Sequence, residues 1–198
     1  MLRGVFHKSI FLFAALMLLE AACCVIDSCG CGHSEGATRY RITGYRLNTA
    51  TDTNQPVLAD RPVRAPQLRL VLTPSHEFIS STRAGFKALM ACSPAEPAPT
   101  QRILKMEITS NAPFELVTGT LSAGANLNGL FFLTNGPYGE GSLESFLSAP
   151  SIDASLYDYV LRLTSSVAKE QTHRFLIRVQ LSDNQVFSLE TGAVLLQP

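Results

Sequence analysis

The stretch "HRFLIRVQLSD", residues 173–183, decides the fold class, because its side chains follow a period of two. Phe175, Ile177, Val179 and Leu181 fall at every second position, with Leu, Arg and Gln between them. An extended chain points successive side chains to opposite faces of a sheet. This pattern is typical of a β-strand with one buried face and one largely wet face.

The same alternation recurs along the chain and predicts several further strands. It appears in residues 38–47, 67–73, 102–110 and 157–165, and residues 186–196 indicate two short strands about Thr191 and Gly192. The apolar positions expected in the core are Tyr40, Ile42, Leu68, Leu70, Leu72, Leu104, Met106, Ile108, Tyr159, Leu161 and Leu163.

The segments between these strands read as turns and short helical pieces. Residues 48–56 and 93–100 have the composition of loops, and residues 124–132 and 142–149 resemble short helical turns. Residues 81–91 fit either a short helix or a strand edge. Because no βαβ alternation is present, the sequence predicts a mainly β fold, an antiparallel β-sandwich that is immunoglobulin-like in the broad sense. A partly open barrel is the alternative.

Length and charge limit the classes of function. The chain has 198 residues, which suits one domain of ordinary size plus a targeting segment. It carries 16 basic and 16 acidic side chains, so its net charge is zero. A nucleic-acid-binding protein normally gathers a basic excess on one face. We therefore expect no nucleic-acid partner.

The N-terminus has the organisation of a secretory signal peptide. Arg3, His7 and Lys8 form a short basic region, and residues 10–19 form a continuous apolar run. This run is much shorter than the roughly 20 residues that a membrane-spanning helix needs. Small residues follow it, as they do before a signal-peptidase cleavage point. We expect residues 1–22 to be removed, and no later segment is long and apolar enough to span a bilayer.

The junction after this apolar run resembles a bacterial lipobox, in which a cysteine is acylated after cleavage. Ala21 and Ala22 occupy the two small positions before Cys23, although Glu20 stands where a lipobox usually has an apolar residue. Cys24 is the alternative lipid site. The expected organisation is a signal peptide over 1–22, a Cys/Gly-rich tether over 23–37 and one β-sandwich domain over 38–198.

The cysteines that remain after acylation are candidates for disulfides. If Cys23 carries the lipid, Cys24, Cys29, Cys31 and Cys92 are left in an oxidising compartment, and four cysteines allow three pairings. Cys92 is the only one remote from the tether, so we expect a bridge from Cys29 or Cys31 to Cys92. The sequence does not choose between these pairings.

The tether also suggests metal binding as a weaker alternative. Cys29, Cys31 and His33 are soft-metal ligands on a glycine-rich backbone, but no second pair of ligands follows at a structural zinc spacing. Disulfides or free thiols are therefore favoured, and we expect no metal and no other cofactor.

No catalytic signature stands out in the rest of the chain. Ser142 lacks the context of a nucleophile elbow. His76 is expected in a turn and His173 on the surface at the start of a strand. Glu140 and Glu144 form a carboxylate pair that is expected in a solvated loop. The sequence therefore predicts no catalytic residue and a protein that is not an enzyme.

Several stretches together resemble a known family. They are the lipobox cysteine with its tether, "YRITGYRL" (40–47), "ILKMEITSNAPF" (103–114), "AGANLNGLF" (123–131) and "HRFLIRVQLSDNQVFSLET" (173–191). In these the chain is similar to small cell-envelope lipoproteins of Bacteroidetes-type bacteria, a family of unknown function. The resemblance implies an envelope location and a β-sandwich, and it assigns no site residues.

The leading hypothesis is a non-enzymatic lipoprotein of the bacterial cell envelope. A lipid on Cys23 would hold it in a membrane, expected to be the outer membrane, and the loops of the sandwich would face a protein or glycan partner. Tyr138, in a Gly/Pro-rich loop, is a plausible contact for such a partner. A metal-handling lipoprotein and a diverged hydrolase are the alternatives.

Overall fold

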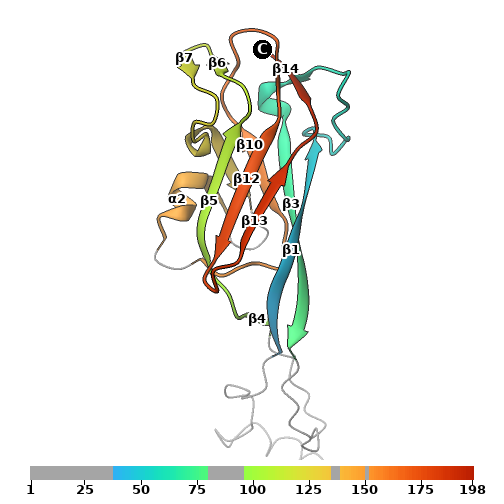
Figure 1. The fold of residues 1–198 in the computed structure, drawn as a ribbon. Coiled ribbons are helices and arrows are strands. Elements are labelled where there is room, and N and C mark those ends of the chain that lie inside the picture. Colours follow the sequence, from blue (N-terminus) through green and yellow to red (C-terminus); the bar gives the residue numbers. More distant parts are fainter. Residues whose placement is uncertain (1–37, 80–95, 135–138, 150–151) are drawn as a thin grey trace, which may run out of the picture. The chain divides into compact units, whose positions relative to one another are not determined.

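A computed structural model describes residues 38–79, 96–134, 139–149 and 152–198 (Figure 1). The chain divides into two units, and Arg39–Ser80 together with Ala98–Pro198 form the unit described below. The other unit, Met1–Thr38 with Ser81–Pro97, lies almost wholly outside the described residues. The expected signal peptide, the tether and the sites at Cys23, Cys24, Cys29, Cys31, Cys92 and His33 all fall there.

A six-stranded sheet forms one layer of the domain, with the order β4-β1-β3-β10-β8-β9. Its strands are β1 (Arg39–Ala50), β3 (Arg69–Ile79), β4 (Ala98–Pro99), β8 (Phe131–Thr134), β9 (Glu140–Ser142) and β10 (Tyr159–Leu163). Neighbouring strands are antiparallel except β4, which runs parallel to β1 over two residue pairs.

A three-stranded antiparallel sheet, in the order β13-β12-β5, forms the second layer. Its strands are β5 (Ile103–Ser110), β12 (Phe175–Leu181) and β13 (Val186–Glu190), and Figure 1 shows them side by side, to the left of β1 and β3. Ring contacts join the two layers: Phe131 of β8 lies 6.0 Å from Phe175 of β12, and Tyr45 of β1 lies 5.3 Å from Phe187 of β13. The predicted β-sandwich is confirmed.

Short elements complete the domain. They are β2 (Val63–Arg64), β6 (Phe114–Leu116), β7 (Gly119–Leu121), β11 (Gln171–His173), β14 (Val194–Gln197), the 3₁₀ turns η1 (Ala65–Gln67) and η2 (Asn128–Leu130), and the helix α2 (Leu143–Leu147). The strands β11, β14 and β2 form a small sheet, in which β14 and β2 are parallel, and β6 and β7 form a hairpin. The expected short helical turns are present. Ser142 begins α2 as its N-cap, because its hydroxyl accepts a hydrogen bond from the backbone N–H of Ser145.

The predicted core is correct except at Leu104. That side chain is 59% exposed, whereas its neighbour Ile103 is 4% exposed. The cause is a register shift against β12: Gln180 pairs with Lys105, but the next residue, Leu181, pairs with Ile103. One extra residue on β5 reverses the side-chain alternation at this point, so Leu104 points to solvent.

A second irregularity reverses the alternation within β1. Its register against β3 shifts between Ile42 and Gly44. Before the shift Tyr40 and Ile42 are buried, and after it the buried residue is Tyr45. The strand also continues to Ala50, into the segment that the sequence predicted to be a loop. The bulge therefore keeps both halves of a long strand against the core.

Three tyrosines are buried in this core, and their hydroxyl groups differ in their partners. The Tyr40 hydroxyl donates to the Ala154 carbonyl at 2.8 Å, and the Tyr159 hydroxyl accepts from the Ser155 N–H at 2.8 Å. The Tyr45 hydroxyl has no hydrogen-bond partner among the described residues. Burial, together with a smaller contribution from Tyr40, raises the pKa of Tyr45 far above its usual range.

The Tyr45→Phe substitution is expected to stabilise the domain by about 1 kcal/mol, because burial of an unpaired hydroxyl costs free energy. Urea unfolding of both proteins measures the difference. The Tyr159→Phe variant is the matched control and should lose about 1–2 kcal/mol, since it leaves the Ser155 N–H without its acceptor. A loss of stability in Tyr45→Phe as large as that in the control would contradict the prediction.

Candidate functional site

The candidate site is formed by the long connection between β1 and β3. Its first part is a tight turn in which the Thr51 N–H donates to the Gln55 carbonyl at 2.8 Å and the Gln55 N–H donates to the Thr51 hydroxyl at 3.2 Å. Asn54 has a positive φ of 60°, a conformation that asparagine tolerates better than most residues. The Thr- and Asn-rich composition of this segment thus closes the turn locally.

The second part of the connection is attached to the small sheet. Val63 and Arg64 form β2, which pairs with β14, and the Val63 side chain is buried. Pro66 lies in η1, where the fixed φ of proline suits a helical turn. The Leu68 N–H then donates to the Ala65 carbonyl at 3.1 Å as the chain enters β3. Both ends of the connection are therefore held by the folded domain.

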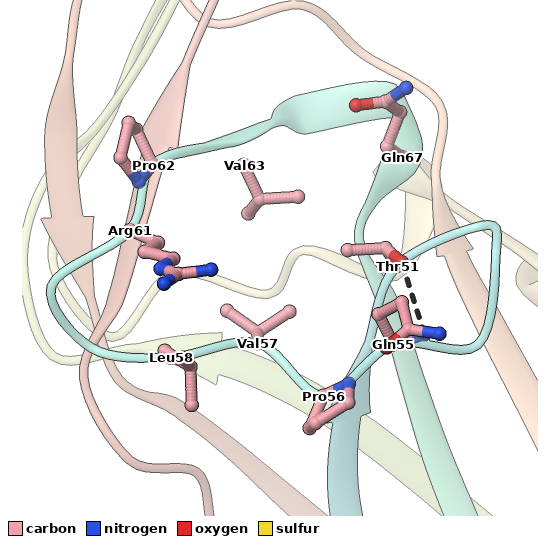
Figure 2. Close-up of a pocket in the computed structure, with 9 residues that line it drawn as sticks. All are labelled: Thr51, Gln55, Pro56, Val57, Leu58, Arg61, Pro62, Val63 and Gln67. Atoms are coloured by element: carbon pink, nitrogen blue, oxygen red, sulfur yellow. Dashed lines mark hydrogen bonds between the residues drawn. The ribbon is translucent and has the colours of Figure 1, made fainter.

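A pocket of about 340 Å³ lies within this connection. Its lining residues are Thr51, Gln55, Pro56, Val57, Leu58, Arg61, Pro62, Val63 and Gln67. Figure 2 shows the guanidinium group of Arg61 pointing into the ring that these residues form. Arg61 makes no ion pair with a described residue. The exposed acids of the same loop, Asp52 and Asp60, do not line the pocket.

The lining combines one cation with apolar walls and a few polar groups. Val57, Leu58 and Val63 supply the apolar surface, while the side-chain amides of Gln55 and Gln67 supply hydrogen-bond donors and acceptors. The volume is near the lower end of the range for small-molecule sites, roughly 300–1,000 Å³. Such a pocket suits a small ligand, or the end group of a larger one, that joins a carboxylate to a short apolar part.

His173 was expected on the surface, and this expectation is wrong. Its side chain is 1% exposed and packs against Phe114, with ring centroids 4.6 Å apart, and against Phe175 at 5.9 Å. Its Nδ1 atom shares a hydrogen bond of 2.7 Å with the hydroxyl of Ser110, which is 3% exposed. Burial lowers the pKa of His173 to about 4. The ring lies inward because His173 pairs with Val194 of β14, which is also buried, whereas the neighbouring Arg174 remains exposed.

The Ser110–His173 pair does not have the arrangement of a catalytic dyad open to substrate. In a serine hydrolase the second imidazole nitrogen contacts an orienting carboxylate. Here Nε2 of His173 is buried and has no hydrogen-bond partner among the described residues. Neither residue lines the pocket. The pair is a buried polar contact of the core.

His76 was expected in a turn, but it lies within β3, where its exposed ring is 5.0 Å from that of Phe78. Pro74 does not end the strand, because β10 pairs only with Arg69–Leu72 and β3 has one hydrogen-bonded neighbour at the proline.

The remaining predicted polar residues are not gathered into one site. Glu140 is exposed at β9, where its carboxylate accepts from the Thr134 hydroxyl at 3.2 Å, and Glu144 is exposed on α2. Ser142 caps α2, and Tyr138 lies outside the described residues.

Among the described residues, no three His, Cys, Asp or Glu side chains come together in a way that would hold a metal ion. No described helix has the length and apolar character needed to cross a bilayer. The metal candidates Cys29, Cys31 and His33 lie outside this part of the chain.

Sequence reasoning missed the pocket. It predicted residues 48–56 only as a loop and did not select Arg61. The available signal was an isolated arginine before a proline, between two segments of turn composition. An arginine before a proline is too common in loops to identify a site by itself. The site becomes visible only once β2 is known to pair with β14.

The chain has no match among protein families or among curated proteins. Solved structures with some similarity include the C-terminal domain of the AgI/II polypeptide BspA of Streptococcus agalactiae, at 7% identity and a TM-score of 0.28, covering 78% of this chain and 49% of that chain. A second structure, titled BspA_C_WT, has 6% identity and a TM-score of 0.26, covering 82% and 50%. The chain thus spans about half the length of these structures.

Proposed function

We propose that this protein is a non-enzymatic binding module of the bacterial cell envelope, attached to the outer membrane by a lipid on Cys23. The N-terminal pattern of basic residues, apolar run and small residues before Cys23 supports the attachment. Cys24 is the alternative lipid site. The partner is a protein or glycan of the envelope, and the loops of the sandwich contact it.

One observation carries the binding function: Arg61, which forms no ion pair with a described residue, points into the pocket in the connection from β1 to β3. A guanidinium group without a carboxylate partner among the described residues can bind a carboxylate of a ligand. The apolar walls of Val57, Leu58 and Val63 would contact the part of the ligand next to that carboxylate. No observation on the described residues favours the metal-handling or hydrolase alternatives.

The Arg61→Gln substitution is expected to weaken binding of a small apolar carboxylate about tenfold, which corresponds to the loss of roughly 1.4 kcal/mol. N-acetylalanine is the probe and its uncharged amide is the reference ligand, titrated into the full chain and followed by NMR shifts. The wild-type chain should prefer the carboxylate, and Arg61→Gln should remove that preference.

The matched control for this experiment is Arg64→Gln. Arg64 is exposed, belongs to the same connection and does not line the pocket. Its substitution should leave the affinity for N-acetylalanine unchanged. Equal losses in both variants, or equal binding of the acid and the amide, would refute the proposed role of the pocket.

The Cys23→Ser substitution is expected to abolish incorporation of labelled fatty acid and to release the protein into the soluble fraction. Several acyl chains on one cysteine hold a protein far more firmly than a single chain, whose attachment is marginal. Fractionation of cells that express the full chain measures the effect, and Cys24→Ser is the matched control. If Cys24→Ser alone abolished labelling, the lipid site would be Cys24. If neither variant changed it, the anchor would be refuted.

A further inference from the structure

Charges on the outer face of the three-stranded sheet are balanced by neighbours of opposite sign. Arg178 of β12 pairs directly across the strands with Glu107 of β5, and Lys105 lies 2.6 Å from Glu107. Arg174, just before β12, lies 3.7 Å from Glu190 of β13. Opposite charges in cross-strand positions stabilise a sheet.

At the centre of the outer face of the six-stranded sheet, two like charges lie in cross-strand positions. Arg69 of β3 and Arg162 of β10 are direct cross-strand partners. Their neighbours Leu68, Leu70, Leu161 and Leu163 are all buried, so both arginines point away from the core. Neither forms an ion pair with a described residue.

Repulsion between Arg69 and Arg162 lowers the stability of the sheet, and the fold does not need two arginines at these positions. Side chains in direct cross-strand positions have Cβ atoms about 4.5–5.5 Å apart, and like charges there destabilise the sheet. Positions where a protein breaks such a local rule are commonly functional. Two neighbouring guanidinium groups of this kind can bind a ligand that carries negative charge.

The arrangement around the pair is ordered and adds to the positive character of the face. The Arg162 guanidinium lies 5.4 Å from the ring centroid of Phe132, its cross-strand neighbour on β8, and this contact restrains its position. Arg46 of β1 lies on the same face. The acids on this face include Glu140 of β9, Asp158, which directly precedes β10, and Glu77 of β3, which forms an ion pair with Arg41 of β1.

We propose that this face binds an anionic polysaccharide, with Arg69 and Arg162 contacting successive carboxylates. At Arg69 and Arg162 the strands β3 and β10 are paired on both sides, so a peptide cannot add there as a further strand. A bound polysaccharide needs no such backbone pairing, because carboxylates on its sugar rings can be bound by the arginine side chains alone.

Short polar side chains beside the arginines suit the same ligand. Thr73 of β3 and Asn48 of β1 lie on this face next to the apolar Val71. Hydroxyl and amide groups both donate and accept hydrogen bonds, which matches the hydroxyl groups of sugars. This surface is distinct from the loop pocket, because neither arginine lines the pocket.

The test is binding of the full chain to polygalacturonate, measured by calorimetry at low and high salt. The double variant Arg69→Gln/Arg162→Gln should bind at least tenfold more weakly than the wild type, and wild-type binding should weaken as salt increases. The matched control is Arg174→Gln/Arg178→Gln, which removes the same charge from the three-stranded sheet and should bind like the wild type. Uncharged dextran should not bind.

A stability measurement separates loss of binding from misfolding. Because like charges are removed, the Arg69→Gln/Arg162→Gln variant should unfold at the same urea concentration as the wild type or a higher one. Equal losses of binding in the two double variants would show nonspecific charge attraction and overturn the proposal. So would unchanged binding in Arg69→Gln/Arg162→Gln, or binding of polyglutamate in place of polygalacturonate, which would indicate an acidic protein partner.

Discussion

The Asn128→Ala substitution is expected to lower the free energy of unfolding by about 4 kcal/mol, the largest effect of a polar substitution that we foresee in this domain. Asn128 lies in η2 and is buried. Its Oδ1 atom accepts from the Ile108 N–H at 3.0 Å, and its Nδ2 atom donates to the Met106 carbonyl at 2.8 Å. Both backbone groups belong to β5.

The size of the effect follows from the position of β5 at the edge of its sheet. β12 pairs with one side of β5, and Asn128 bonds to the other side as a neighbouring strand would. The Leu127 N–H continues this pattern by donating to the Ile108 carbonyl at 2.8 Å. Alanine would leave two buried backbone groups unpaired, and each costs about 1–3 kcal/mol.

Urea unfolding of Asn128→Ala measures this loss, and two further variants define its cause. Asn128→Asp keeps the shape and the acceptor but removes the donor to the Met106 carbonyl, so it should also destabilise strongly. Asn48→Ala removes an exposed asparagine of β1 and should change stability by less than about 0.5 kcal/mol. A loss below 1 kcal/mol in Asn128→Ala would contradict the proposed edge protection.

Acidification from pH 7 to pH 4 is expected to cost the domain about 3 kcal/mol through His173 alone. Burial lowers the pKa of His173 in the folded protein to about 4, below its ordinary value of 6.5. As the pH falls below 6.5, the unfolded chain therefore binds a proton before the folded chain does. The contribution is fully present above pH 6.5 and is lost as the pH falls through the folded-state pKa.

The double variant His173→Phe/Ser110→Ala tests this assignment. Phenylalanine at position 173 fits between the rings of Phe114 and Phe175. The Ser110→Ala substitution removes the hydroxyl that would otherwise lose its hydrogen bond to the His173 ring. Free energies of unfolding at pH 7, 5.5 and 4 should fall less steeply in this variant than in the wild type.

The control for the acid measurement is His76→Gln, which removes one exposed imidazole from β3. It should keep the steep dependence of the wild type on pH. If the double variant and the wild type lost the same stability between pH 7 and pH 4, the acid sensitivity would have to come from other groups.

Side-chain amides protect backbone at two other places in the domain. Oε1 of Gln101 accepts from the Ile42 N–H of β1 at 2.5 Å, and its Nε2 atom donates to Asp183 at 2.6 Å. Gln171 bonds to both the N–H and the carbonyl of Glu115 in β6. Exposed strand edges favour pairing between molecules, and these amides occupy backbone groups that could otherwise take part in it.

Much of the core was predictable because the strands that form it are regular. Every second residue from Phe175 to Leu181 is buried, as it is in β10 and from Leu68 to Leu72. The prediction failed at Leu104 because a bulge depends on the partner strand, and a period of two carries no information about an extra residue.

The candidate sites were less predictable than the core. His173 looked like a surface residue because it stands next to Arg174, but its burial depends on Phe114, 59 positions earlier in the chain. Arg69 and Arg162 each looked like an ordinary solvated arginine. They form a pair only because β10 lies beside β3, a neighbour that local composition does not specify.

The sequence by itself determined the β class and most of the buried face of each regular strand, and it predicts a lipid-anchored envelope protein. These depend on patterns within short segments, where the alternation of side chains or the order of basic, apolar and small residues is sufficient. Tertiary structure alone decided the bulges, the burial of His173, the pocket around Arg61 and the pairing of Arg69 with Arg162. The bulges, the burial of His173 and the arginine pair arise from contacts between segments far apart in the chain, and the pocket lies in a connection that the pairing of β2 with β14 holds in place.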